Sequence, residues 1–156
     1  MRIHKRAATV LSALVAFSGF ALTTAPTASA AGYGCSGSQI GAYAVKTSGG
    51  TTFGTAYLYY DSSTGKNCAA AVKNSTGGYG ASTYTSVSIE KCTQTSPASV
   101  CTLLNPRVYD NDGDNYLYYA GPVSVSSPNN CIHLGAVIWN GNGSFAQYNS
   151  GAFHCS

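Results

Sequence analysis

Six cysteines constrain the fold of this chain more than any other feature of its 156 residues. They are Cys35, Cys68, Cys92, Cys101, Cys131 and Cys155. An even number of cysteines in an exported chain is typical of a disulfide framework. A zinc site of cysteines would use Cys-x-x-Cys pairs, and the sequence contains none. We therefore expect three disulfides and no metal bound by these thiols.

One of the three pairings follows from local spacing. Cys92 and Cys101 flank the segment 93–100, which is rich in Ser and Thr and lies between two β-like stretches. We predict a disulfide that closes this loop. For the other four cysteines we favour Cys35–Cys68 and Cys131–Cys155, and the remaining connectivities stay open.

The first thirty residues predict export. Three basic residues precede an apolar run over 7–22, and the segment ends in Ala28-Ser29-Ala30. This order is typical of a secretory signal peptide, and the apolar run is shorter than the roughly 20 residues that span a bilayer. We predict a signal peptide over 1–30, a single domain over 31–156, and no membrane attachment after cleavage.

Charge is scarce in the predicted mature chain. Charged residues make up 8% of the sequence, and three of the eight basic residues lie in the predicted signal peptide, which leaves five against five acidic residues. Nucleic-acid binding relies on clustered Lys and Arg, so we expect no nucleic-acid partner. Few titratable groups also disfavour acid–base catalysis, while the many aromatic residues argue against disorder.

Short β-like segments separated by turn signals dominate the mature chain. The clearest strands are 53–60, 84–91 and 131–139. We also expect a strand over 116–125, placed at an edge or carrying a bulge because of Gly121-Pro122. No helical periodicity is evident. These patterns predict an all-β, disulfide-stapled antiparallel sandwich or barrel of about seven to nine short strands.

Two similar tetrapeptides raise the question of a two-fold internal repeat. Tyr57-Leu58-Tyr59-Tyr60 recurs as Tyr116-Leu117-Tyr118-Tyr119, and a spacing of 24 residues also occurs twice between cysteines. A duplication of similar β units explains both matches. Coincidence in a tyrosine-rich chain explains them equally well.

Three acidic residues are grouped as Asp110, Asp112 and Asp114. Alternating aspartates can present several oxygens to Ca²⁺, so a weak calcium site is one interpretation. An EF-hand loop is excluded, because its sixth and twelfth positions would be Asn115 and Gly121. The other interpretation is a turn over 110–115 that side-chain to backbone hydrogen bonds stabilise. We expect no other cofactor.

Few residues suit catalysis. His133 and His154 are the only mature histidines, and no Gly-x-Ser-x-Gly motif is present. Glu90 and Arg107 with one histidine would supply a base, a cation and an acid for phosphodiester cleavage, but they form no local pattern. We therefore assign no catalytic residue.

Tyrosine occurs 12 times in the sequence and is the side chain most suited to a binding role here. We predict an aromatic surface formed by Tyr57, Tyr59, Tyr116, Tyr118 and Trp139. Such a surface can stack on sugar rings or form a protein interface, because tyrosine offers a rigid face and a polar tip. The alternative is an ordinary tyrosine-rich core and surface.

Two stretches resemble a known family. The run Asn115-Tyr116-Leu117-Tyr118-Tyr119-Ala120-Gly121-Pro122-Val123, followed by Cys131-Ile132, is similar to the signature of the actinobacterial spore-associated protein A family. The segment 54–60, followed by Gly65-Lys66-Asn67-Cys68, also resembles it. The chain departs from the family at 133–136 and in its additional Cys92/Cys101 loop. The resemblance implies secretion and association with the spore or hyphal surface, and transfers no catalytic residue.

These observations lead to a functional expectation. We expect a secreted, non-enzymatic protein of the spore or cell surface whose partner is a wall or spore-surface component. One alternative is a module that binds extracellular polysaccharide. Another is an inhibitor of foreign enzymes that uses the clamped loop 93–100, since preorganisation reduces the cost of binding. A small hydrolase is the least expected.

Overall fold

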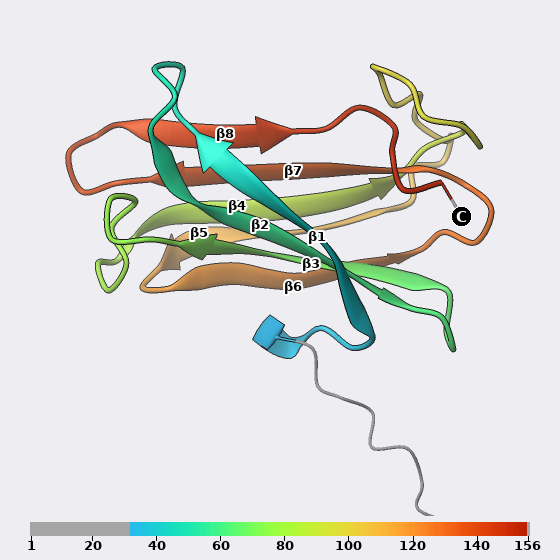
Figure 1. The fold of residues 1–156 in the computed structure, drawn as a ribbon, viewed down its shortest axis with the longest axis horizontal. Coiled ribbons are helices and arrows are strands. Elements are labelled where there is room, and N and C mark those ends of the chain that lie inside the picture. Colours follow the sequence, from blue (N-terminus) through green and yellow to red (C-terminus); the bar gives the residue numbers. More distant parts are fainter. Residues whose placement is uncertain (1–31, 156) are drawn as a thin grey trace, which may run out of the picture.

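Eight strands account for nearly all regular structure in residues 32–155, the part of the chain that the computed structural model describes (Figure 1). The predicted signal peptide over 1–30 lies outside the described residues. The elements are the 3-10 turn η1 (Gly32–Gly34) and the strands β1 (Ser38–Lys46), β2 (Thr52–Asp61), β3 (Lys66–Lys73), β4 (Thr83–Lys91), β5 (Tyr109–Tyr116), β6 (Tyr119–Ser126), β7 (Ile132–Trp139) and β8 (Phe145–Asn149). No helix in this part is long and apolar enough to cross a membrane.

The strands form one antiparallel sheet that curls into a nearly closed barrel. Their spatial order is β5-β4-β7-β8-β1-β2-β3-β6, and every neighbouring pair is antiparallel. The two outer strands, β5 and β6, follow one another in sequence and lie against each other, which brings the edges of the sheet together (Figure 1). The all-β prediction is confirmed, and the architecture is a barrel rather than a sandwich.

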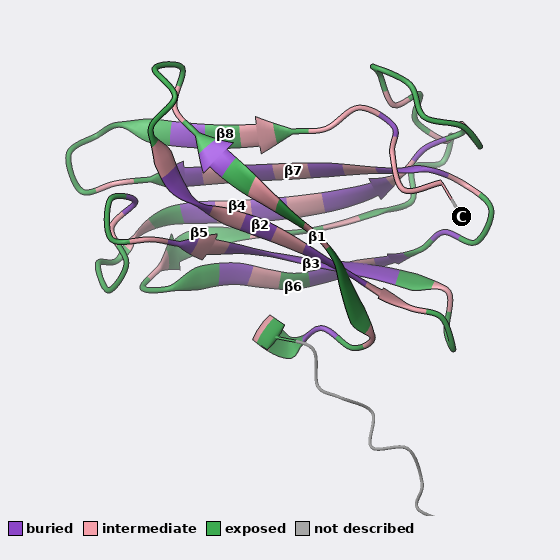
Figure 2. Ribbon diagram, viewed as in Figure 1, coloured by how far each residue is buried: buried purple, intermediate pink, exposed green. Residues whose placement is uncertain are grey.

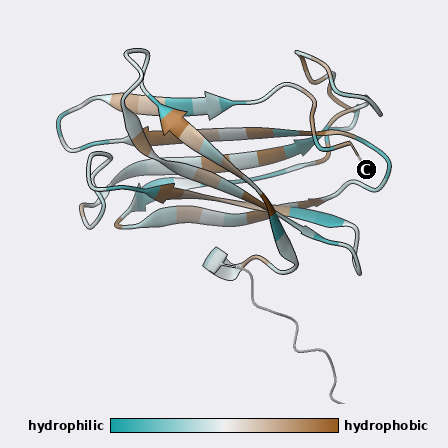
Figure 3. Cartoon of the chain, in the orientation of Figure 1, coloured by the Kyte–Doolittle hydropathy of each residue, from teal (hydrophilic) through white to brown (hydrophobic). Residues whose placement is uncertain are grey.

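Period-two alternation explains which residues fill the barrel. On β7, Ile132, Leu134, Ala136 and Ile138 are buried while the residues between them are not. The same alternation on β4 buries Val87 and Ile89. Figures 2 and 3 show the buried and apolar positions recurring along the same strands. Each large aliphatic side chain that is fully buried here stabilises the fold by roughly 1.5–3 kcal/mol.

The strand β3 is buried on both faces. Ala69 and Ala71 belong to the barrel core, and Cys68 on the opposite face packs with Cys35 and Tyr59. Small alanine side chains suit this position, because the segment around η1 lies over the outer face. The disulfide Cys35–Cys68 holds that segment in place.

The three predicted disulfides are the ones in the structure: Cys35–Cys68, Cys92–Cys101 and Cys131–Cys155. The first fixes the segment before β1 to β3, the second closes the loop after β4, and the third ties the chain after β8 to the start of β7. No free cysteine is found among the described residues.

The acidic segment 110–115 is a strand and not the turn that its composition predicts. It lies within β5, which pairs with β4 from Glu90↔Tyr109 to Thr83↔Tyr116. The cross-strand register outweighs the turn-forming residues. The actual turn falls at 117–118, so the predicted strand 116–125 is divided there. Its bulge is confirmed, because Gly121 and Pro122 lie opposite the register shift between Ala69 and Ala71.

The internal repeat has no structural counterpart. The first tetrapeptide, 57–60, lies inside β2, whereas the second, 116–119, spans the end of β5, a turn and the start of β6. The two spacings of 24 residues between cysteines are not equivalent either. Cys131 and Cys155 are bonded to each other, whereas Cys68 and Cys92 are not. After β8 the chain forms only isolated bridges, at Ala152 and Phe153.

Candidate binding surface

Five tyrosines from four segments of the chain gather on the outside of the barrel. We call them the tyrosine patch: Tyr33, Tyr57, Tyr79, Tyr118 and Tyr119. The ring of Tyr33 stacks on Tyr57, with centroids 5.3 Å apart, and contacts Tyr119 at 5.3 Å. The rings of Tyr79 and Tyr118 contact each other at 4.8 Å. Tyr79, Tyr118 and Tyr119 keep 57%, 46% and 37% of their surface exposed. These rings form a surface that offers aromatic faces to solvent.

The position of Tyr33 depends on an unusual backbone conformation. Its φ is 63° and its ψ is 30°, in the left-handed region that bulky residues rarely adopt. Such a residue costs roughly 1–3 kcal/mol and persists only when its surroundings hold it. Here Gly34, with φ of 82°, follows directly, and the nearby Cys35–Cys68 disulfide anchors the segment. Burial, and then the phenols of Tyr57 and Tyr79, raise the pKa of Tyr33.

A buried lysine holds the segments that carry Tyr79 and Tyr118. The Lys73 ammonium donates to Ala81 O at 2.7 Å, to Thr83 Oγ1 at 2.6 Å and to Tyr116 O at 2.9 Å. Only 3% of Lys73 is exposed, and burial lowers its pKa. Its three donors are thus all used by neutral oxygens from three neighbouring segments.

Backbone hydrogen bonds complete the positioning of the same two tyrosines. Gly80 N donates to Leu117 O at 2.8 Å, and Lys73 N donates to Tyr118 O at 3.0 Å. The loop after β3 and the β5–β6 turn are therefore fixed to each other beside Tyr79 and Tyr118. The patch is held by the fold and does not depend on a partner to assemble it.

Two hollows adjoin the tyrosine patch. The first, of about 570 Å³, is lined by Gly32, Tyr33, Gly37, Ser38, Gln39, Tyr57 and Tyr59. The second, of about 400 Å³, is lined by Asn115, Tyr116, Leu117, Tyr118, Tyr119 and Gly121. Neither lining contains a charged side chain. Tyr33 of the first lining contacts Tyr119 of the second, so the two hollows are neighbours.

The aromatic residues predicted from sequence divide into different settings. Tyr57 and Tyr118 belong to the patch, and Tyr59 is buried beneath it with the Cys35–Cys68 disulfide. Tyr116 packs against the barrel core. Its hydroxyl donates to Asp112 Oδ1 at 2.6 Å, which raises the pKa of Tyr116 to about 12. Trp139 lies at the end of β7 and stacks on Phe145 at 5.3 Å.

The aromatic surface predicted from sequence did not include Tyr119, and sequence reasoning missed Tyr33 and Tyr79 entirely. Both residues occur in the tripeptide Gly-Tyr-Gly, at 32–34 and at 78–80. Glycines on both sides of an aromatic residue indicate a backbone shaped to present that ring, and Gly34, Gly78 and Gly80 all have positive φ. This recurring tripeptide is the signal that identifies them.

All three aspartates proposed for calcium accept backbone hydrogen bonds, and two of them do so across the seam between β5 and β6. Asp110 Oδ2 accepts from Ser124 N at 2.8 Å, and Asp112 Oδ2 accepts from Gly121 N at 2.7 Å. Asp114 accepts from its neighbour Asn115 N. Within residues 32–155 no group of three or more His, Cys, Asp or Glu side chains is placed to hold a metal ion. The calcium interpretation therefore has no cluster to support it.

The structure does bring together Glu90, Arg107 and His133. Glu90 on β4 is the register partner of His133 on β7, and Arg107 Nε lies 2.5 Å from Glu90 Oε1. The Arg107 guanidinium also lies 4.9 Å from the centroid of the Tyr109 ring. The His133 imidazole is hydrogen-bonded to Asn149 Oδ1. The carboxylate and the imidazole each have a protein partner, and we assign neither a catalytic role.

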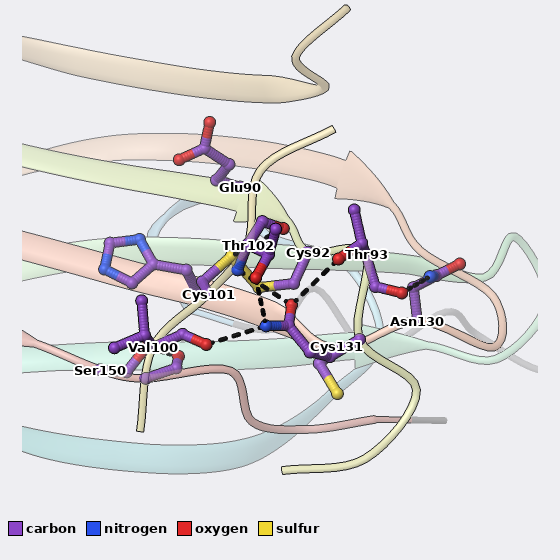
Figure 4. Close-up of a disulfide and its surroundings, with 12 residues drawn as sticks. Glu90, Cys92, Thr93, Val100, Cys101, Thr102, Asn130, Cys131 and Ser150 are labelled. Carbon is purple, nitrogen blue, oxygen red and sulfur yellow. Dashed lines mark hydrogen bonds between the residues drawn. A yellow bond between two sulfur atoms is a disulfide. The ribbon is translucent and has the colours of Figure 1, made fainter. Parts of the chain in front are cut away.

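The disulfide-clamped loop lines a cavity of about 330 Å³ together with Glu90 and His133. Figure 4 shows the Cys92–Cys101 disulfide that closes the loop. Within the loop, Gln94 Nε2 donates to Val100 O and to Thr102 Oγ1, both at 2.9 Å. Gln94 Oε1 accepts from Thr102 N at 3.0 Å. The loop is therefore braced from inside, while Val100 at its end is 69% exposed.

Comparison with known proteins places the chain in a family. No family model and no solved structure matches it. It is 38% identical over 136 residues to a protein of Streptomyces coelicolor, Spore-associated protein A, and the match covers 83% of this chain and 78% of that protein. The resemblance expected from the Tyr-Ala-Gly-Pro-Val stretch is thereby confirmed. With this identity over most of both chains, the protein belongs to the Spore-associated protein A family.

Proposed function

We propose that this protein is secreted, associates with the spore or cell surface, and attaches there through the tyrosine patch. The name of its Streptomyces relative supports spore association. Three disulfides support residence outside the cell, because such bonds persist in oxidising compartments. The observation that carries the proposal is the group of exposed, prepositioned tyrosine rings.

A partner that covers these rings gains a large contact area. Large rigid aromatic groups bury much area at low conformational cost when a partner binds, and they dominate many interfaces. In this protein the patch is already ordered by a disulfide, by the hydrogen bonds of Lys73 and by backbone hydrogen bonds. Attachment therefore carries little entropic cost for ordering the patch. The proposal assigns no chemical reaction, since the Glu90 carboxylate and the His133 imidazole are each engaged by another side chain.

Retention on washed spores tests the proposal. The secreted protein and its Tyr79→Ala/Tyr118→Ala variant are each added to spores of the producing organism, and the bound fraction is measured after salt washes. Tyr109→Ala is the matched control, because Tyr109 is 55% exposed but lies at the far end of β5. We expect retention of the wild type and the control, and release of the double variant. Equal retention of all three proteins would overturn the assignment of the patch.

A second candidate function follows from the braced loop at 93–100. Its disulfide, its internal Gln94 bonds and the exposed Val100 suit a rigid segment that docks into another protein, as in a secreted enzyme inhibitor. Assays of extracellular serine proteases with wild-type protein and the Val100→Asp variant test it. Inhibition that Val100→Asp abolishes supports this candidate, and absence of inhibition by the wild type removes it.

A further inference from the structure

We infer that the tyrosine patch recognises an uncharged polysaccharide whose chain lies across both hollows. This inference rests on the proposed function and names the chemical class of the surface component. The first reason is geometric, because Tyr33 and Tyr57 line the first hollow, Tyr118 and Tyr119 line the second, and the ring contact of Tyr33 with Tyr119 makes the two hollows neighbours. An extended polymer fits such a pair of hollows better than a single small molecule.

The chemistry of the linings favours sugar rings. Tyrosine faces pack against the C–H face of a pyranose, while the phenol oxygens remain available for hydrogen bonds with hydroxyl groups. Ser38 and Gln39 add a hydroxyl and an amide to the first hollow, and Asn115 adds an amide to the second. Amides and hydroxyls both donate and accept hydrogen bonds, as a polyhydroxylated ligand requires.

The charges around the two hollows favour a neutral polymer over an anionic one. The lining of both hollows carries no cationic side chain to pair with a phosphate or a carboxylate. Tyr116, which lines the second hollow, is hydrogen-bonded to Asp112, and Asp114 is exposed on the same strand. The Asp112 carboxylate, one hydrogen bond from this lining, repels an anionic chain, whereas a neutral polysaccharide meets no such penalty. The Lys73 ammonium also contacts Tyr116, but it is buried and its three donors are occupied, so it does not pair with an anionic group of a ligand.

A site that extends over both hollows predicts that affinity depends on the length of the oligosaccharide. If the chain lies across both hollows, oligosaccharides that fill only one of them make part of the contacts. Affinity must then rise with oligosaccharide length until both hollows are occupied. A site for a single sugar residue would show no such dependence.

Binding of the secreted protein to defined glycans tests the inference. The probes are cellulose, chitin and curdlan as neutral polymers, with polygalacturonate and poly(glycerol phosphate) as anionic polymers on matched particles. Titration calorimetry with soluble oligosaccharides of increasing length follows for any polymer that binds. We expect at least one neutral polymer to bind and the anionic polymers not to bind at physiological salt.

Variants locate the binding. Tyr118→Ala and Gln39→Ala, one beside each hollow, should each weaken binding of the long chain, with the aromatic loss costing about tenfold or more. Tyr109→Ala and Trp139→Ala keep wild-type affinity, because both residues lie outside the linings. Circular dichroism and thermal unfolding establish that each variant is folded.

The outcomes distinguish this inference from the proposed function. Neutral-glycan binding that Tyr118→Ala weakens and Tyr109→Ala preserves supports the inference. If none of the neutral polymers binds, or only anionic polymers bind, while the patch variant is still released from spores, the inference falls and the proposed function stands with a protein or anionic partner. Glycan binding that Tyr118→Ala leaves unchanged also overturns it.

Discussion

Individual side chains in this protein fix loop segments in place where the hydrogen bonds between strands do not reach. Lys73 is the clearest case, because its buried ammonium has three oxygen partners and no carboxylate among its hydrogen-bond acceptors. Tyr33 is another, because a strained backbone presents its ring to Tyr57 and Tyr119. In both cases one residue connects the fold to the tyrosine patch.

Replacing Lys73 by Met should destabilise the protein by about 2–3 kcal/mol. The apolar side chain fits the same path but leaves the Ala81 and Tyr116 carbonyls without their donor, and an unsatisfied buried polar group costs roughly 1–3 kcal/mol. Urea unfolding measures the change. The control is Lys46→Met at an exposed position, where we expect a change within about 0.5 kcal/mol. A Lys73→Met protein as stable as the wild type would contradict the role of the ammonium.

The phenol of Tyr116 predicts a loss of stability at alkaline pH. Its folded pKa is raised from 10.0 to about 12, chiefly by the hydrogen bond to Asp112. A raised folded pKa contributes stability that is fully present below pH 10 and is lost as the pH rises through about 12. The raised pKa values of Tyr33, Tyr43, Tyr59 and Tyr148 act in the same direction, and the lowered pKa of Lys73 opposes them.

Unfolding midpoints between pH 9 and pH 12, measured for the wild type and for Tyr116→Phe, test this dependence. The variant lacks the titrating hydroxyl, so its midpoint should fall less steeply in this range. Identical slopes for the two proteins would show that the Tyr116–Asp112 hydrogen bond does not govern the alkaline response.

At the scale of elements, the closure of the barrel depends on side chains of one strand and backbone of another. Asp110 and Asp112 on β5 accept hydrogen bonds from the backbone of β6. These two strands have no ladder between them, since β5 pairs with β4 and β6 pairs with β3. The two carboxylates therefore take the place of a ladder at the seam.

Substituting Asp112 by Ala should open this seam locally. The variant loses the acceptor for Gly121 N and for the Tyr116 hydroxyl, and we expect a destabilisation of roughly 1–3 kcal/mol. Hydrogen exchange at the amides of Gly121 and Ser124 should accelerate more than exchange in β7. Asp114→Ala is the control, because its carboxylate bonds only the adjacent Asn115 amide. Unchanged exchange at Gly121 would refute the seam.

Elements with a local signal could be predicted from the sequence, and those fixed by distant contacts could not. The alternation of Ile132, Leu134 and Ile138 identifies β7 as a core strand, because large aliphatic residues at every second position indicate a buried strand face. The segment 110–115 reads as a turn because Asp, Asn and Gly favour turns locally, and only its pairing with β4 makes it a strand. The tyrosine patch is similar, because Tyr33 meets Tyr57 and Tyr119 through tertiary packing that no sequence window contains.

At the scale of the whole molecule, the disulfides compensate for the modest core of a small domain. They join the segments outside the ladder to the barrel at β3, at the end of β4 and at the start of β7. In the chain-entropy model, closing a loop of about 30 residues stabilises by about 3.5–4 kcal/mol and closing one of about 10 residues by about 2.5 kcal/mol.

Removing single disulfides should therefore have graded effects. Replacing Cys35 and Cys68 by Ala lowers stability more than replacing Cys92 and Cys101, by about 1 kcal/mol in that model. It should also reduce retention on spores, because the first disulfide positions Tyr33, whereas the second replacement should leave retention unchanged. Thermal unfolding and the spore assay measure the two effects separately. A larger loss from the Cys92/Cys101 pair would contradict the ranking.

The seam between β5 and β6 has a consequence for the association of one copy of the chain with another. An unpaired strand edge is a template on which copies of a chain can stack into fibrils. Here the two edges of the sheet face each other, with the Asp110 and Asp112 carboxylates inserted between them. At this seam the fold thus withholds the backbone of β5 and β6 from amyloid growth, while the rings of Tyr79, Tyr118 and Tyr119 remain exposed.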